Sequence, residues 1–240
     1  IKEVSGDGTY YYEQIISLTA SVNEGYEFVS WSIGDANHNT NYKVLDSIII
    51  KATSKAITYT ISYNLNDGIL DNNNPTSYTI ESDDITLNNP HKLGYNFTGW
   101  SLNNDTPQIN RVINKGSYGN LNFVANFTPR NDIDYKVEHY IEESDGKYTL
   151  YETDTKTDVV GKTVKAVPYN YGGFSVNNNH PNAILSGTVS SYTTLRLKVY
   201  YSRNSYKVTY KYSGVTPEGA TPLPEEKTYK YYDAVTLAPK

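Results

Sequence analysis

The sequence has 240 residues, a formal net charge of −5, and 25 tyrosines but no cysteine or methionine. The absence of cysteine excludes disulfides and thiol chemistry. Lysine and arginine are scattered along the chain and give phosphate groups no concentrated positive field, so we expect no nucleic-acid partner. No apolar run approaches the roughly 20 residues that a membrane-spanning helix needs, so we expect no membrane insertion. The 38% hydrophobic content suits small domains better than one thick core.

Residues 1–56 form the first predicted segment, which contains the motif Gly25-Tyr26-Glu27-Phe28-Val29-Ser30-Trp31. An apolar stretch around Ile48–Ile50 has the length of a strand, and the residues at 53–56 separate it from a second, tyrosine-rich strand. We therefore place a domain boundary near residue 56.

Residues 57–130 form the second segment and repeat the motif as Gly94-Tyr95-Asn96-Phe97-Thr98-Gly99-Trp100. Gly, Tyr, Phe and Trp keep their places in two copies that stand about 70 residues apart, which is the size of a small domain. The segment opens with the alternating strand Tyr59–Tyr63. Asp67-Gly68 then predicts a tight hairpin, because Asp-Gly supplies residues with positive φ.

Residues 131–204 form a third segment, and residues 205–240 begin a partial fourth one. The third segment carries a degenerate copy of the motif, Tyr171-Gly172-Gly173-Phe174, which has no tryptophan. Alternating strands on both sides of Asp145-Gly146 predict a hairpin. No segment shows about twelve or more residues of helical periodicity, so any helix must be short.

At these residues the sequence resembles known repeat families. Residues 1–129 resemble the internalin-type B repeat, also called the Listeria-Bacteroides repeat. The likeness rests on Asn66-Asp67-Gly68, on the Gly94–Trp100 motif and on a closing strand at Leu121–Phe127. The first segment is similar to a divergent member of this group, with Ser30 at the place of a glycine in the second copy. Compared with the repeat that it resembles, we expect its opening strand to be missing or cut.

The rest of the chain resembles other surface repeats. Residues 133–203 are similar to mucin-binding-protein-like repeats, through features that include Tyr135–Tyr140 and Ser186–Val189, and residues 205–240 resemble the first half of a Gram-positive surface repeat. The resemblances imply β-grasp, ubiquitin-like folds in large bacterial cell-wall proteins, and hence an extracellular, cell-surface location. The expected fold class is therefore β-rich α+β, with tandem small β-grasp modules arranged as an elongated rod.

The repeated aromatic motif has two interpretations. Trp31 and Trp100 could stack on sugar rings, or each could fill a small core beside the Tyr and Phe of its motif. Their recurrence at matching places favours the core, so we assign the motif a structural role, and the sequence identifies no ligand-binding residue. The motif residues are Gly25, Tyr26, Phe28, Trp31, Gly94, Tyr95, Phe97, Gly99, Trp100, Gly173 and Phe174.

No residue set predicts catalysis, metal binding or a cofactor. His38, His91, His139 and His180 are far apart and lack metal-ligand spacing, so we expect surface or strand positions for them. The Asp and Asn residues over 64–74 could hold Ca²⁺, but they lack the EF-hand spacing, and a solvated turn is the better interpretation. An internal Lys-Asn amide crosslink has no identifiable buried acidic partner in the sequence.

We therefore expect a non-catalytic stalk or adhesive repeat region of a secreted bacterial surface protein, present as a monomer. Two alternatives stay open. In the first, the modules themselves bind a host surface protein, a receptor or a mucin glycan. In the second, they are ancillary modules of a secreted carbohydrate-active enzyme.

Overall fold

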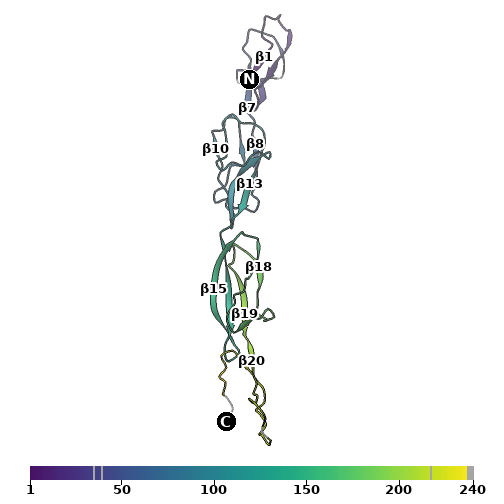
Figure 1. Ribbon diagram of the computed structural model, residues 1–240. Helices are drawn as coiled ribbons and strands as arrows, with labels where there is room; N and C mark the ends of the chain where they lie inside the picture. Colours follow the sequence, from purple (N-terminus) through teal and green to yellow (C-terminus); the bar gives the residue numbers. More distant parts are fainter. Residues whose placement is uncertain (35, 39, 217, 237–240) are drawn as a thin grey trace. The chain divides into compact units, whose positions relative to one another are not determined.

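The structure is a computed structural model that describes residues 1–34, 36–38, 40–216 and 218–236. Tertiary contacts divide the chain into unit 1, which comprises Ile1–Lys92 and Asn96–Thr128, and unit 2, which comprises Leu93–Tyr95 and Pro129–Lys240. The regular elements of the described ranges are strands (Figure 1), which confirms the β-rich expectation. Those ranges contain no helix, so the α+β class and the β-grasp assignment are not confirmed, and none of their elements is a helix that could cross a membrane.

The first part of unit 1, residues 1–56, contains a three-stranded antiparallel sheet and two short ribbons. The sheet has the order β5-β4-β7, and the ribbons pair β1 with β3 and β2 with β6. These strands are β1 (Glu3–Ser5), β2 (Ile15–Ser17), β3 (Thr19–Ser21), β4 (Tyr26–Ile33), β5 (Ala36–His38), β6 (Asn41–Lys43) and β7 (Lys51–Ala56). Ile16, Leu18 and Trp31 form a small buried core, as expected for a thin domain.

The second part of unit 1 contains a mixed four-stranded sheet of order β11-β13-β8-β9. Its strands, with the separate β10-β12 ribbon, are β8 (Tyr59–Asn64), β9 (Ser77–Tyr78), β10 (Ile85–Thr86), β11 (Tyr95–Leu102), β12 (Val112–Ile113) and β13 (Leu121–Pro129). The opening strand β8 runs parallel to the closing strand β13, with Ile61 opposite Leu121. Phe123 and Ala125 alternate along β13 with less buried residues, and both enter a core built around Trp100.

Asp67-Gly68 lies in a tight turn but does not close the hairpin that the sequence predicts. The turn forms as predicted, but its positive φ values, +48° and +62°, fall on Asn66 and Asp67 and not on Gly68, one position earlier than an Asp-Gly turn places them. The chain then leaves the sheet, because Ile69 forms a bridge with His91 instead. The antiparallel neighbour of β8 begins only at Ser77, so the local turn prediction is right and the predicted pairing is wrong.

Unit 2 contains a mixed four-stranded sheet of order β15-β14-β19-β17 and two ribbons, β16-β18 and β20-β21. Its strands are β14 (Ile133–Glu142), β15 (Tyr148–Asp158), β16 (Thr163–Lys165), β17 (Phe174–Val176), β18 (Ser186–Thr188), β19 (Leu195–Arg203), β20 (Ser205–Val208) and β21 (Lys227–Lys230). The hairpin predicted around Asp145-Gly146 is confirmed as β14–β15, with a register shift between His139 and Tyr140. As in unit 1, the first strand of the sheet runs parallel to its last strand, here β14 with β19.

Most buried apolar side chains of the described residues lie in three clusters that share no member. The cluster of unit 2 draws on one face of β14 and β19, where Tyr135 and Val137 meet Leu197 and Val199. Each cluster lies inside one of the segments that the sequence predicts. The segment boundaries near residues 56, 130 and 204 stay predictions.

Candidate functional site

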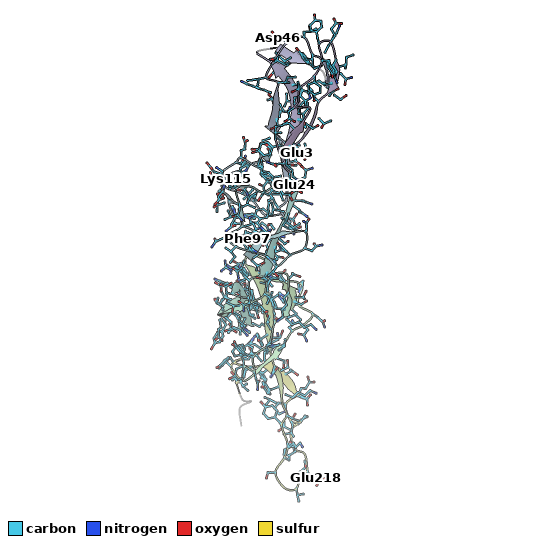
Figure 2. All side chains as sticks on the ribbon, turned by 90° about the horizontal axis from the view of Figure 1, so that it is seen from above. Glu3, Glu24, Asp46, Phe97, Lys115 and Glu218 are labelled. Atoms are coloured by element: carbon cyan, nitrogen blue, oxygen red, sulfur yellow. The ribbon has the colours of Figure 1, made fainter. Side chains whose placement is uncertain are left out.

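The repeated motif places Trp100 in the interior of unit 1. Its side chain is fully buried, and its ring makes edge contacts with Phe97 and Tyr63 at centroid distances of 5.8 and 5.6 Å. Phe97, labelled in Figure 2, comes from the same strand β11. The indole Nε1 donates to the Asn88 carbonyl at 3.3 Å. A sugar-stacking platform needs an exposed face, and Trp100 has none.

Trp31 occupies the matching place in the first part of unit 1 and is 4% exposed. Its ring lies 5.4 Å from that of Phe28, so this copy of the motif also packs inward. Gly99 has φ of +134°, and a Cβ there would lie 2.5 Å from the backbone nitrogen of Gln108, so a side chain has no room. Ser30 stands at the corresponding position in β4, where the register against β7 shifts.

Three of the four motif glycines stand where a turn meets a strand. Gly25, Gly94 and Gly173 directly precede β4, β11 and β17, and their φ values are +80°, +80° and +83°. The aromatic residues that follow them are partly buried, namely Tyr26, Tyr95 and Phe174. The structure therefore puts the part that the three motif copies share, a glycine followed by an aromatic residue, at a chain reversal. None of these residues has a chemistry that predicts catalysis.

Unit 2 contains a buried polar network, centred on His139, that the sequence did not reveal. The His139 side chain is fully buried, and its Nδ1 lies 2.8 Å from the Tyr201 hydroxyl. Its Nε2 is 3.6 Å from Asp154 Oδ2 and has no hydrogen-bond partner. The Tyr169 ring stacks on the imidazole at 4.6 Å, and its hydroxyl donates to Asp154 at 2.7 Å. His139 thus lies on a strand as expected but not at the surface, and its alternation with Val137 was the available signal.

Hydrogen bonds fix the protonation of the groups around this network. The bond from the Tyr169 hydroxyl lowers the pKa of Asp154 and raises the pKa of Tyr169 itself. Burial raises the pKa of Tyr171, and the hydrogen bond that its hydroxyl donates to Glu152 at 2.9 Å raises it further. At neutral pH the hydroxyls keep their protons and the Asp154 carboxylate keeps its charge. The arrangement stabilises the fold and does not resemble a nucleophile beside a general base.

The Asn-rich segment 64–74 uses side-chain amides within the fold. Asn66 Nδ2 donates to the Ala125 carbonyl at 2.7 Å. The Asn74 side chain accepts the Asn88 N–H at 2.7 Å and donates to the Asn88 carbonyl at 3.1 Å. Across the described ranges, no three His, Cys, Asp or Glu side chains gather as metal ligands. These contacts favour the turn interpretation of the segment over a Ca²⁺ site.

An open cavity of about 670 Å³ lies in the first part of unit 1. Its walls include the aromatic side chains of Tyr10, Tyr12, Trp31 and Tyr42. Tyr12 is 75% exposed, so an aromatic face is accessible there although Trp31 is buried. Aromatic walls of this kind suit apolar groups and sugar rings.

A second open cavity, of about 610 Å³, lies in unit 2. Tyr151, Tyr171 and Phe174 contribute to its walls, together with Arg203. The Arg203 guanidinium is buried and pairs with Asp233 at 2.8 Å, which neutralises its charge locally. This cavity therefore offers an incoming anion little net attraction.

Comparison with known families places the first half of the chain. Residues 3–65 match the model described as a divergent InlB B-repeat domain, and residues 59–126 match the model described as a Listeria-Bacteroides repeat domain. The predicted internalin-type resemblance is thereby confirmed. Neither match extends beyond residue 126, so the resemblance of residues 133–203 to mucin-binding-protein-like repeats stays a prediction. No curated protein and no solved structure matches the chain.

Proposed function

Because residues 3–126 belong to the internalin-type B repeats, which occur in bacterial surface proteins, we propose that the chain is a stalk region of a secreted protein attached to the cell wall. In this role the modules hold other domains away from the wall, and repetition adds length without new chemistry. Repeat families of this kind are generally non-catalytic, and we extend that property to the whole chain.

The burial of the repeated aromatic motif carries the proposal. Trp100 and Trp31, the largest residues that recur, are 0% and 4% exposed. The feature that recurs in the first two segments is thus a buried tryptophan that fills a small core, and not an exposed recognition surface. A spacer needs only that, because each added copy must fold and need not bind.

Short connections between the sheets support a semi-rigid series of modules. β7 ends at Ala56 and β8 begins at Tyr59, while β19 ends at Arg203 and β20 begins at Ser205. Connections of a few residues leave little slack. We further propose that each module is a β-grasp-like sheet without a helix, on the basis of the parallel first and last strands in two of the sheets.

Direct binding of a host glycan or surface protein is the second candidate, and the cavity of unit 1 favours it. Tyr12 presents an exposed aromatic ring beside the cavity, which is a suitable platform for a sugar face. In this case the modules would be adhesive and would not serve only as spacers.

A binding assay with the whole chain separates the two functions. The labelled chain is applied to immobilised mucin and to a glycan array, beside the variants Tyr12→Ala and Tyr192→Ala. Tyr192 is 82% exposed and is not among the residues that line either cavity, so it is a matched control. A spacer gives no signal with any of the three proteins. Saturable binding that Tyr12→Ala abolishes and Tyr192→Ala retains would replace the spacer function with the adhesive one.

A further inference from the structure

Three of the four motif glycines, Gly25, Gly94 and Gly173, make an equivalent backbone hydrogen bond. In each case the glycine carbonyl accepts the N–H of the first residue after the closing strand of its own sheet. The donor and acceptor residues are Ile57 with Gly25 at 2.8 Å, Arg130 with Gly94 at 2.9 Å, and Asn204 with Gly173 at 2.8 Å. Since β7, β13 and β19 end one residue earlier, the bond fixes the direction in which the chain leaves each sheet.

In unit 1, a side chain of the following segment occupies the space beside Gly25. A Cβ on Gly25 would lie 2.6 Å from Cδ1 of Ile80, closer than real Cβ atoms approach, and 3.0 Å from Cβ of Ile80, so the Ile80 side chain would have to shift. Ile80 belongs to the segment after residue 56. Beside this contact, the Tyr26 hydroxyl donates to Glu81 at 3.0 Å. An apolar and a polar contact therefore flank the backbone bond.

Unit 2 repeats the arrangement with different side chains. A Cβ on Gly173 would lie 2.4 Å from the ring of Tyr231, which belongs to the segment after residue 204. The same ring makes an edge contact with Phe174 at 5.6 Å. Arg203 completes the contact, because its Nη1 donates to the Tyr231 carbonyl at 2.9 Å and pairs with Asp233 at 2.8 Å.

We propose that the glycine of the repeated motif is a seat for the following module. Its carbonyl holds the departing chain, and its bare Cα accepts one side chain of the next segment: Ile80 at Gly25, Ser191 at Gly94 and Tyr231 at Gly173. The surface thus fits a partner of defined kind, a following module that turns one side chain back onto the glycine, an apolar one at Gly25 and Gly173 and a serine at Gly94. This inference deepens the proposed spacer function and depends on it for its biological use, since a seated module cannot swing freely about its connection.

Two requirements make glycine necessary at the seat, and they can be tested separately. A φ near +80° strains any residue with a Cβ, and the neighbouring side chain leaves a Cβ no space. Gly146 has φ of +82° with no atom within 4 Å of a Cβ placed there. Gly146→Ala therefore imposes the same backbone strain as Gly25→Ala without the contact.

Amide hydrogen exchange of the whole chain, followed residue by residue by NMR, tests the seat. We expect Gly25→Ala to speed exchange of the Ile57 N–H at least tenfold, while the amides of the β8–β13 pair keep their protection. Gly146→Ala should leave Ile57 unchanged. Ile80→Ala, which alters neither the glycine nor its φ, should also speed exchange at Ile57 and so covers the case in which Gly25→Ala unfolds the first part of unit 1.

The outcomes distinguish the seat from the spacer function. The seat is overturned if the Ile57 amide exchanges at the wild-type rate in Ile80→Ala. It is also overturned if that amide exchanges no faster in Gly25→Ala than in Gly146→Ala. Either result leaves a spacer with free connections. Ligand binding in the array experiment overturns the spacer and leaves the seat intact.

Discussion

Phe123→Ala removes a ring from the centre of the larger core of unit 1. Phe123 is 1% exposed, and its ring centroid lies 6.0 Å from that of Tyr63 and 6.4 Å from that of Trp100. Truncating a buried phenylalanine to alanine costs about 3–5 kcal/mol, of which each aromatic contact supplies about 0.5–1.5 kcal/mol. We expect a loss in that range, because the alanine leaves a cavity that neighbouring strands cannot fill.

The size of the loss decides how it will be seen. A segment such as 57–130 has a free energy of unfolding of about 4–11 kcal/mol at the usual value per residue, so the substitution removes about a quarter or more of it. With a urea dependence of about 1 kcal/mol per molar, the midpoint of unfolding falls by about 3–5 M. At the lower end of the stability range, this part of unit 1 is unfolded without urea.

Tryptophan fluorescence provides the assay, because each part of unit 1 contains one tryptophan. In a Trp31→Phe background, the emission of Trp100 reports the core that contains Phe123, and in a Trp100→Phe background Trp31 reports the other core. Ile69→Ala, at a 62% exposed position, is the surface control and should change stability by less than about 0.5 kcal/mol. A midpoint shift under about 1 M, or an equal shift of the Trp31 transition, would refute the separate cores.

Three further substitutions test polar groups. Burial opposes the charge of Glu138, but hydrogen bonds from Arg196 and Tyr140 outweigh it and hold the pKa of Glu138 below its usual value. The stabilisation that this lowered pKa supplies is complete above about pH 4.3, the pKa of a glutamate in the unfolded chain, and is lost as the pH falls below it. Glu138→Gln should therefore flatten the acid side of a plot of Tm against pH. Burial raises the pKa of Tyr63 to about 12, so its stabilisation is present below about pH 10 and is lost as pH rises toward 12; Tyr63→Phe should flatten the alkaline side. His139→Ala should lower the free energy of unfolding by about 1–3 kcal/mol in urea denaturation, because the buried Tyr201 hydroxyl loses a partner.

Each of these expectations has a control. An unchanged acid side in Glu138→Gln would mean that the pair with Arg196 contributes nothing to stability. If Tyr63→Phe leaves the alkaline side as steep as before, other tyrosines cause the transition. His91→Ala, at an exposed imidazole, should be neutral. A loss equal to that of His139→Ala would contradict the role of burial.

Local sequence patterns determined the parts of this protein that depend on near neighbours. Alternation and Asp145-Gly146 predicted the β14–β15 hairpin, since both strands and their turn lie within one continuous stretch. The recurrence of a Gly-Tyr-x-Phe-x-x-Trp pattern predicted repeated modules and an inward position for Trp31 and Trp100. Strict alternation would place Phe28 and Trp31 on opposite faces, because they stand three residues apart, and the register shift between Phe28 and Ser30 accompanies the inward packing of both rings.

Tertiary structure alone decided which strands pair and what fills the spaces between them. Alternation indicates which face of β8 is apolar, but it does not predict that Ile61 pairs in parallel with Leu121, far along the chain. The Asp67-Gly68 signal predicted a hairpin partner for β8 that the structure does not place there. The burial of His139 depends on side chains from β15, from β19 and from the stretch that contains Tyr169 and Tyr171. The contact of Gly25 with Ile80 likewise joins residues that no local pattern relates. The physical reason is that pairing and packing partners are selected when distant segments close over a common core, where fit and hydrogen bonding count and sequence distance does not.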